Sequence, residues 1–98
     1  MKVSKNALLH QIAHLNRITG HKLEPYNITN NGLTRNDGTY FLDEYNGFRL
    51  SQMTKEGERN PLGLYRHTKS EMFFILDAFI TGVESTLALV EEKINNKG

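Results

Sequence analysis

The chain has 98 residues, of which 38% are hydrophobic and 23% charged, and it contains no cysteine. This size and composition fit one folded domain, residues 1–98, and exclude disulfides, thiol catalysis and cysteine-ligated zinc. The formal net charge of +1 gives no overall attraction to nucleic acid or to a membrane surface.

A first helix is predicted over residues 4–19. Ser4 is a typical N-cap residue, and Gly20 can take the left-handed conformation that ends a helix. Apolar residues recur between them at helical spacing, and they are Leu8, Ile12, Leu15 and Ile18.

Residues 26–53 are predicted to form an antiparallel meander of three or four strands. The pairs Asn31-Gly32, Asp37-Gly38 and Asn46-Gly47 each signal a tight turn. The segments around them are short and rich in aromatic and β-branched residues, and they cover residues 26–29, 33–35, 39–43 and 48–53. The polar residues 54–67 are predicted to be a loop.

A second, long helix is predicted to run to about Asn95. Thr68 and Glu71 have the spacing of a capping box at its start. An apolar stripe follows, made of Met72, Leu76, Phe79, Val83, Leu87, Val90 and Ile94. Gly82 lies midway, where it marks a kink, a break or a close crossing with the first helix. The predicted fold class is α+β, with the long C-terminal helix packed on the sheet.

Candidate catalytic and metal-binding residues are sparse. His10 and His14 share one helix face, but residue 11 is Gln where zinc proteases have a glutamate, and no third ligand is evident. No serine lies in a Gly-x-Ser-x-Gly elbow, and no glycine-rich phosphate loop is present. We therefore expect two solvent-facing histidines, no metal, no cofactor and no enzymatic activity.

A basic cluster of Arg66, His67 and Lys69 precedes the second helix. Free amides at a helix N-terminus favour an anion, so this cluster is a candidate contact for a phosphate or a carboxylate. The favoured alternative pairs Arg66 and Lys69 with the glutamates Glu56, Glu58 or Glu71. With Arg35 and Arg49 and neighbouring tyrosines, the cluster also allows weak nucleic-acid binding.

A protein interface is the leading functional prediction. The second helix is about 40 Å long and the first about 24 Å, so the stripe at Leu87, Val90 and Ile94 extends beyond the first helix. Two helices also leave part of the sheet uncovered. Its aromatic residues are interpreted first as core and second as a protein interface, with Tyr40 and Tyr45 as the candidate interface residues. The expected partner is a second copy of the chain or a bacterial host factor.

Four short motifs occur in a known order: LNRITG at 15–20, EPY at 24–26, YNGFRL at 45–50, and KSE at 69–71 with AFITG at 78–82. This set resembles small uncharacterised proteins carried by phages and prophages of low-GC Gram-positive bacteria. Phe48 stands where that family has a second hairpin glycine. The resemblance implies a phage accessory protein in the bacterial cytoplasm. A signal peptide and a membrane span are not expected, because no long uninterrupted apolar run is present.

Overall fold

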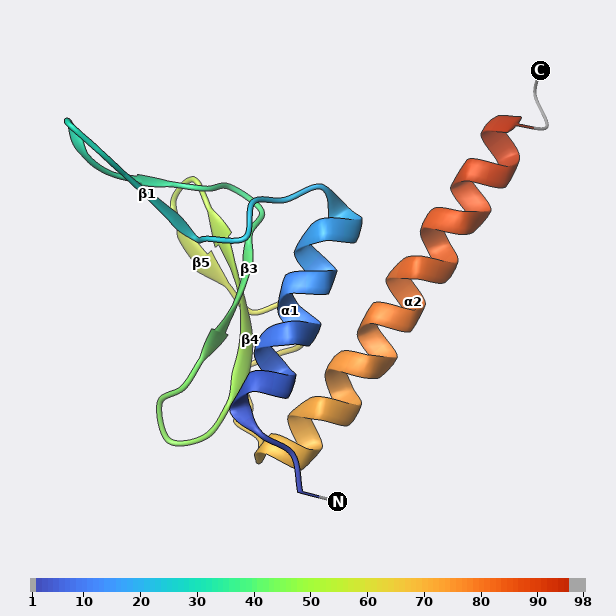
Figure 1. Cartoon of the computed structure of the whole chain (residues 1–98), viewed down its shortest axis with the longest axis horizontal. Helices are drawn as coiled ribbons and strands as arrows, with labels where there is room; N and C mark the ends of the chain where they lie inside the picture. Colours follow the sequence, from blue (N-terminus) through green and yellow to red (C-terminus); the bar gives the residue numbers. More distant parts are fainter. Residues whose placement is uncertain (1, 96–98) are drawn as a thin grey trace.

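The computed structural model describes residues 2–95, which form two helices and five strands (Figure 1). In chain order these are α1 (Lys5–Thr19), β1 (Tyr26–Thr29), β2 (Gly32–Arg35), β3 (Tyr40–Asp43), β4 (Arg49–Thr54), β5 (Gly57–Arg59) and α2 (Lys69–Asn95). The α+β class, with an N-terminal helix, antiparallel strands and a long C-terminal helix, is confirmed.

The caps of α1 and α2 form as the sequence predicts. The Ser4 hydroxyl accepts a hydrogen bond from the Ala7 amide at 3.2 Å, and Gly20 ends α1 with a φ of 76°. At α2 the Thr68 amide donates to the Glu71 carboxylate at 2.8 Å, and the Glu71 amide donates to the Thr68 hydroxyl at 3.2 Å. Both helix starts are therefore fixed by local side chains rather than by distant packing.

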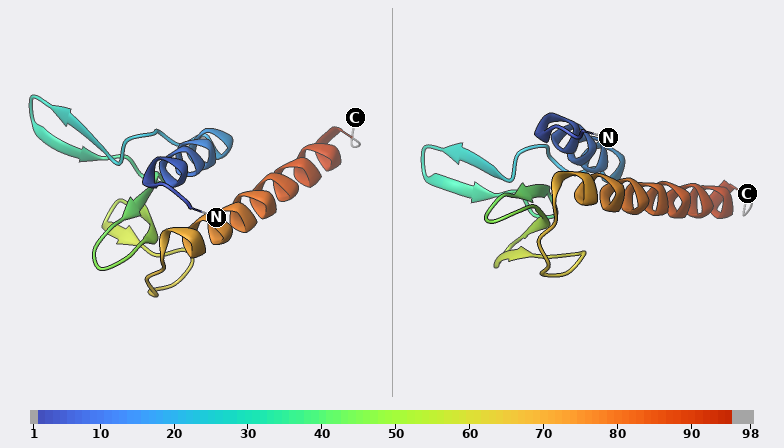
Figure 2. Two further views of the ribbon diagram at one scale, coloured as in Figure 1. Left: turned by 60° about the horizontal axis from the view of Figure 1, so that its bottom comes forward. Right: turned by 90° about the horizontal axis from the view of Figure 1, so that it is seen from below.

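The predicted single meander is wrong in its pairing, because the strands form two separate sheets. β1 and β2 make a two-stranded hairpin, and β3, β4 and β5 make a three-stranded antiparallel sheet in that order. Asn36 explains the break: its amide N–H donates to the Pro25 carbonyl and its side chain to the Glu24 carbonyl, both closing the base of the hairpin. The chain then turns away, so β3 does not pair with β2. The hairpin projects from the body (Figure 2).

The predicted loop over residues 54–67 contains β5, which the sequence pattern missed. Gly57 has a φ of 150°, which allows the chain to reverse after β4. Gln52 pairs with Arg59 across the two strands, and the Arg59 Nε donates to the Gln52 side chain at 2.6 Å. β5 is a polar edge strand with no apolar alternation, so periodicity gave no signal for it.

The core lies between α1, the three-stranded sheet and the first half of α2. Its buried members are Val3, Leu8, Ile12, Leu15, Tyr40, Leu50, Met72, Leu76 and Ile80. α2 packs mainly along α1, and α1 in turn packs on β3. α2 reaches the sheet where the ring of Phe79 meets Tyr40 edge-on at 6.1 Å.

Asn16 joins α1 to the outer edge of β3. Its side chain donates to the Tyr40 carbonyl at 2.9 Å and accepts from the Tyr40 amide at 2.8 Å, and it is 1% exposed. The amide group thus satisfies two backbone groups that an edge strand otherwise leaves free. This contact fixes the position of the sheet on the helix.

α2 is continuous through Gly82, which is neither a break nor a close crossing. A methyl group added at Gly82 would meet none of the described residues within 4 Å. By length and composition α2 is also apolar enough to cross a membrane, and 11% of its most apolar 18-residue window is buried. No membrane span was expected from the sequence, because the chain has no long uninterrupted apolar run. α2 is apolar on average, but Asp77 and Glu84 interrupt it.

Candidate functional site

A cluster of charged side chains forms where β3, β4 and the segment before α2 meet. Asp43, at the end of β3, accepts a hydrogen bond from Arg49 of β4 at 2.8 Å. Arg66 binds the same carboxylate through both of its terminal nitrogens, at 2.9 and 3.1 Å. Asp43 is 18% exposed, and the two arginines are 17% and 22% exposed, so water screens these contacts weakly.

The guanidinium groups hold the Asp43 carboxylate in its charged form. Hydrogen bonding to Arg66, assisted by Arg49, lowers the pKa of Asp43 from 3.8 to about 2 against the opposing effect of burial. The same carboxylate raises the pKa of Arg66. A carboxylate with so low a pKa is a poor general base at neutral pH, so the cluster suits a structural role better than acid–base chemistry.

A backbone contact brings the Asn46-Gly47 hairpin against the segment before α2. Phe48 and His67 exchange two backbone hydrogen bonds of 2.9 Å. Gly47 has a φ of 113°, and a Cβ there would lie 3.1 Å from the Arg66 side chain and 3.2 Å from the His67 carbonyl. The turn therefore needs glycine for its conformation and for this close approach.

Of the three side chains in the basic cluster predicted from the sequence, Arg66 is the one that makes an ion pair among the described residues. Arg66 does pair with a carboxylate, but with Asp43 rather than with Glu56, Glu58 or Glu71. The amides at the start of α2 are partly used by the Thr68 and Glu71 cap, and this capping lowers the pKa of Glu71. Lys69 is exposed beside them.

Arg35 lies apart from the other predicted cations. It is on β2, opposite Tyr26 of β1, in the projecting hairpin. The structure thus brings together Arg49 and Arg66, with His67 and Lys69 following directly in the chain, but not Arg35. Binding of an anion by Arg49, Arg66, His67 and Lys69 stays a prediction.

The predicted interface residues fall into two groups. Tyr40 is 8% exposed and belongs to the core, so it cannot contribute to an open surface. β4 does not leave a bare face either, because Ser51 and Met53, which alternate with Leu50, are as buried as Leu50. Tyr45 is 72% exposed, with the Arg66 guanidinium 5.7 Å from its ring centre.

The second half of α2 carries a row of exposed apolar side chains. α1 has 15 residues and α2 has 27, so α1 covers only the first part of α2 (Figure 1). Leu87, Val90 and Ile94 are 43%, 49% and 66% exposed. They continue the stripe that is buried at Met72, Leu76 and Ile80.

His10 and His14 belong to no group of three potential metal ligands among the described residues. His14 lies 3.6 Å from the Glu84 carboxylate of α2, and His10, one turn earlier on the same face of α1, is exposed. Among residues 2–95 no group of three or more His, Asp or Glu side chains could hold an ion.

Sequence reasoning missed two side chains that position this region, Asn16 and Asp43. Asn16 belongs to a recurring motif, but its partner Tyr40 is 24 residues away and is brought close only by the fold. Asp43 meets Arg66 only in the fold, while its neighbour Glu44 binds Lys5 at 2.8 Å. Comparisons with models of protein families, with curated proteins and with solved structures found no match.

Proposed function

We propose that the protein is a non-catalytic protein-binding module, a phage or prophage accessory protein of the bacterial cytoplasm, that associates with a second copy of itself. The second half of α2 is the binding element. The observation that carries this proposal is the exposed continuation of the same apolar stripe that packs on α1. The phage origin is supported by the order of the four motifs described above.

The stripe has the spacing of a coiled-coil seam. Leu76, Ile80, Val83, Leu87, Val90 and Ile94 follow one another at steps of four, three, four, three and four residues. Such a 3.5-residue period lets one helix pack lengthwise on another, with side chains of each filling gaps in its partner. α1 occupies the seam as far as the half-buried Val83, and the last three positions are open.

A second copy fits the open seam best in an antiparallel arrangement. If the two α2 helices ran parallel, the α1 helices of both copies would lie at the same end of the pair, where α1 already covers the seam. Antiparallel entry keeps the two bodies at opposite ends and sets Leu87 of each copy against Val90 of the other. The contact is then two-fold symmetric and closed.

The charges beside the seam predict how salt affects this association. Glu84 and Glu91 are seven residues apart and lie on the same flank of α2. In an antiparallel pair these flanks face each other, so the glutamates repel across the contact. Salt screens that repulsion and strengthens apolar contacts, so association should tighten as ionic strength rises.

The alternative partner for so apolar a helix is a lipid bilayer. Asp77 and Glu84 oppose insertion, because a charged residue near the centre of a spanning helix costs about 2.5–3.5 kcal/mol. Met72, Leu76 and Ile80 are also already buried against the body, and Glu84 lies beside His14 of α1. These contacts favour a protein partner over lipid.

Sedimentation velocity of the full chain, from about 10 to about 500 µM, tests the proposal. We expect a monomer–dimer equilibrium that shifts toward dimer when salt rises from about 50 to about 500 mM. This change shortens the Debye length from about 14 to about 4 Å and so screens the repulsion between glutamates. Leu87→Asp should abolish the dimer. Leu89→Asp is the matched control, because Leu89 is 59% exposed on the opposite side of α2.

Circular dichroism should show that both variants keep their helices, since both leucines are exposed. A strict monomer over the whole concentration range would refute self-association. Equal loss of the dimer in both variants would place the contact elsewhere. Co-sedimentation of the wild-type chain with neutral and anionic vesicles, lost in Leu87→Asp, would assign the stripe to lipid instead.

A further inference from the structure

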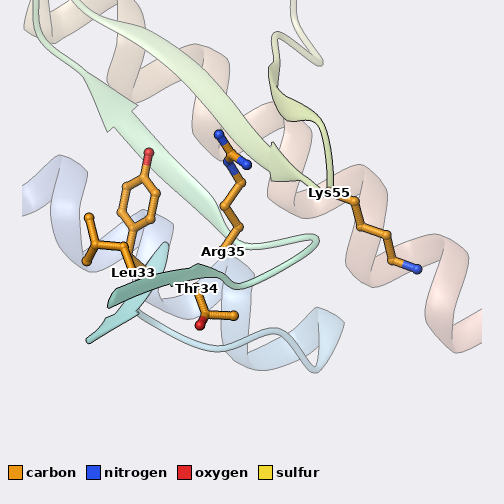
Figure 3. A pocket seen from close by; sticks show the side chains of 5 residues that line it. Leu33, Thr34, Arg35 and Lys55 are labelled. Atoms are coloured by element: carbon orange, nitrogen blue, oxygen red, sulfur yellow. The ribbon is translucent and has the colours of Figure 1, made fainter. Parts of the chain in front are cut away.

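An open hollow of about 580 Å³ lies between the projecting β1–β2 hairpin and the turn that joins β4 to β5. It is lined by Tyr26, Leu33, Thr34, Arg35 and Lys55. Figure 3 shows Leu33 and Arg35 standing on one side of the hairpin, Thr34 pointing to the other side, and Lys55 extending from the neighbouring turn. We propose that this hollow binds single-stranded nucleic acid, with a base on the Tyr26 ring and backbone phosphates on Arg35 and Lys55.

Strand register places the aromatic ring and the guanidinium together. Tyr26 and Arg35 are direct cross-strand partners in the antiparallel hairpin, so their side chains rise from the same face. The next pair on that face is Ile28 and Leu33, which are 87% and 68% exposed. The face is thus an apolar and aromatic strip with a cation at its base.

Both cations of the hollow are available to a ligand. Within residues 2–95, neither Arg35 nor Lys55 makes an ion pair or a side-chain hydrogen bond, whereas Arg49 and Arg66 are held by Asp43. Among the described residues, no acidic side chain lines the hollow, although Asp37 and Glu56 line a neighbouring depression together with Lys55. A ligand that combines negative charge with a flat ring fits this lining, and a nucleotide unit has both.

The openness of the site favours a polymer over a free nucleotide. All five lining residues are exposed, so the hollow cannot enclose a small molecule as metabolite sites do. A chain can cross an open trough and gain contacts on either side of it. Duplex DNA keeps its bases stacked inside the helix, so it cannot offer a base face to Tyr26.

Fluorescence anisotropy with a labelled oligothymidylate of roughly 15 nucleotides at low salt tests the site. We expect salt-sensitive binding that is weakened about 5- to 100-fold by Tyr26→Ala, with Tyr26→Phe close to wild type. Arg35→Gln should weaken binding about tenfold and reduce the salt slope by about 1. Arg17→Gln is the matched control, because Arg17 is an exposed cation on α1 and should leave binding unchanged.

Several results would overturn the proposal: no binding at low salt, equal losses in Arg35→Gln and Arg17→Gln, or duplex binding as tight as single-strand binding. Displacement of the oligonucleotide by polyglutamate at equal charge would indicate an acidic protein partner instead. Displacement by free thymidine monophosphate at equal nucleotide concentration would indicate a mononucleotide site. Leu87→Asp should bind the oligonucleotide like the wild type, so this test is separate from self-association.

Discussion

Replacing Asp43 by Asn removes the carboxylate charge of β3 that pairs with Arg49 of β4 and with Arg66 of the segment before α2. The substitution keeps nearly the same volume, but it puts an amide N–H₂ group where one carboxylate oxygen accepted from a guanidinium. Arg49 and Arg66, which are 17% and 22% exposed, are then left without their counter-charge. The change should therefore destabilise the fold rather than remove a ligand site.

The size of this effect follows from the contacts. Removing one partner of a fully buried ion pair costs about 3–5 kcal/mol, and partial solvent access at Asp43 reduces this to about 2–3 kcal/mol. For a domain of this size, each kcal/mol lowers the melting temperature by about 4–8 °C. We expect a fall of about 10–20 °C.

Urea unfolding and thermal circular dichroism measure the loss. Asp37→Asn is the control, because Asp37 is exposed and has no ion pair within the described part of the chain, and its effect should stay below about 0.5 kcal/mol. If Asp43→Asn is as stable as Asp37→Asn, the cluster does not hold the hairpin against α2. The two arginines would then be available for an anion, as the sequence suggested.

Three further predictions concern stability. The folded-state pKa of Asp43, about 2, lies below its ordinary value of 3.8, so its stabilising effect is present above about pH 4 and is lost as pH falls through 2; acid titration of unfolding should show this loss in the wild type and not in Asp43→Asn. Gly82→Ala should raise the free energy of unfolding by up to about 1 kcal/mol, since the added methyl meets nothing, and a decrease would reveal a hidden contact. Asn16→Ala should lower the free energy of unfolding by about 2–4 kcal/mol in the same urea assay, because the backbone N–H and C=O of Tyr40 both lose their hydrogen-bond partner. A loss below about 1 kcal/mol would contradict a stabilising role for these two hydrogen bonds.

Local signals predicted the helices well. Ser4, Gly20, Thr68 and Glu71 act within three or four residues of the helix ends they fix, so a sequence reading can find them. The same holds for Asn31-Gly32 and Asn46-Gly47, which lie at the turns between the paired strands β1 and β2 and β3 and β4.

Contacts between distant segments were not predictable in this way. The split into two sheets depends on Asn36 closing onto Pro25 and Glu24, and turn chemistry alone does not say which strands pair afterwards. The candidate site depends on Asp43 meeting Arg66, which is 23 residues further along the chain. The sequence pattern therefore favoured nearby glutamates instead of Asp43 as partners of Arg66 and indicated no partner for Arg49.

The predicted interface residues also divide into those that local sequence features could place and those that depend on distant contacts. The free length of α2 was predictable from helix lengths alone. Strand alternation did not decide whether Tyr40 is core or interface, because α1 and α2 both cover it only after they have packed together.

Distance measurement between spin labels on a single-cysteine variant tests the central claim most directly. The chain has no cysteine, so Asn95→Cys gives one exposed label per copy near the end of α2. Antiparallel pairing, with Leu87 facing Val90, offsets the two labels by about 13 residues, or about 20 Å along the helix axis. A distance near or above 20 Å that disappears in Leu87→Asp is predicted; absence of any intermolecular distance at high concentration would contradict self-association, and labels within about 10 Å would contradict its antiparallel form.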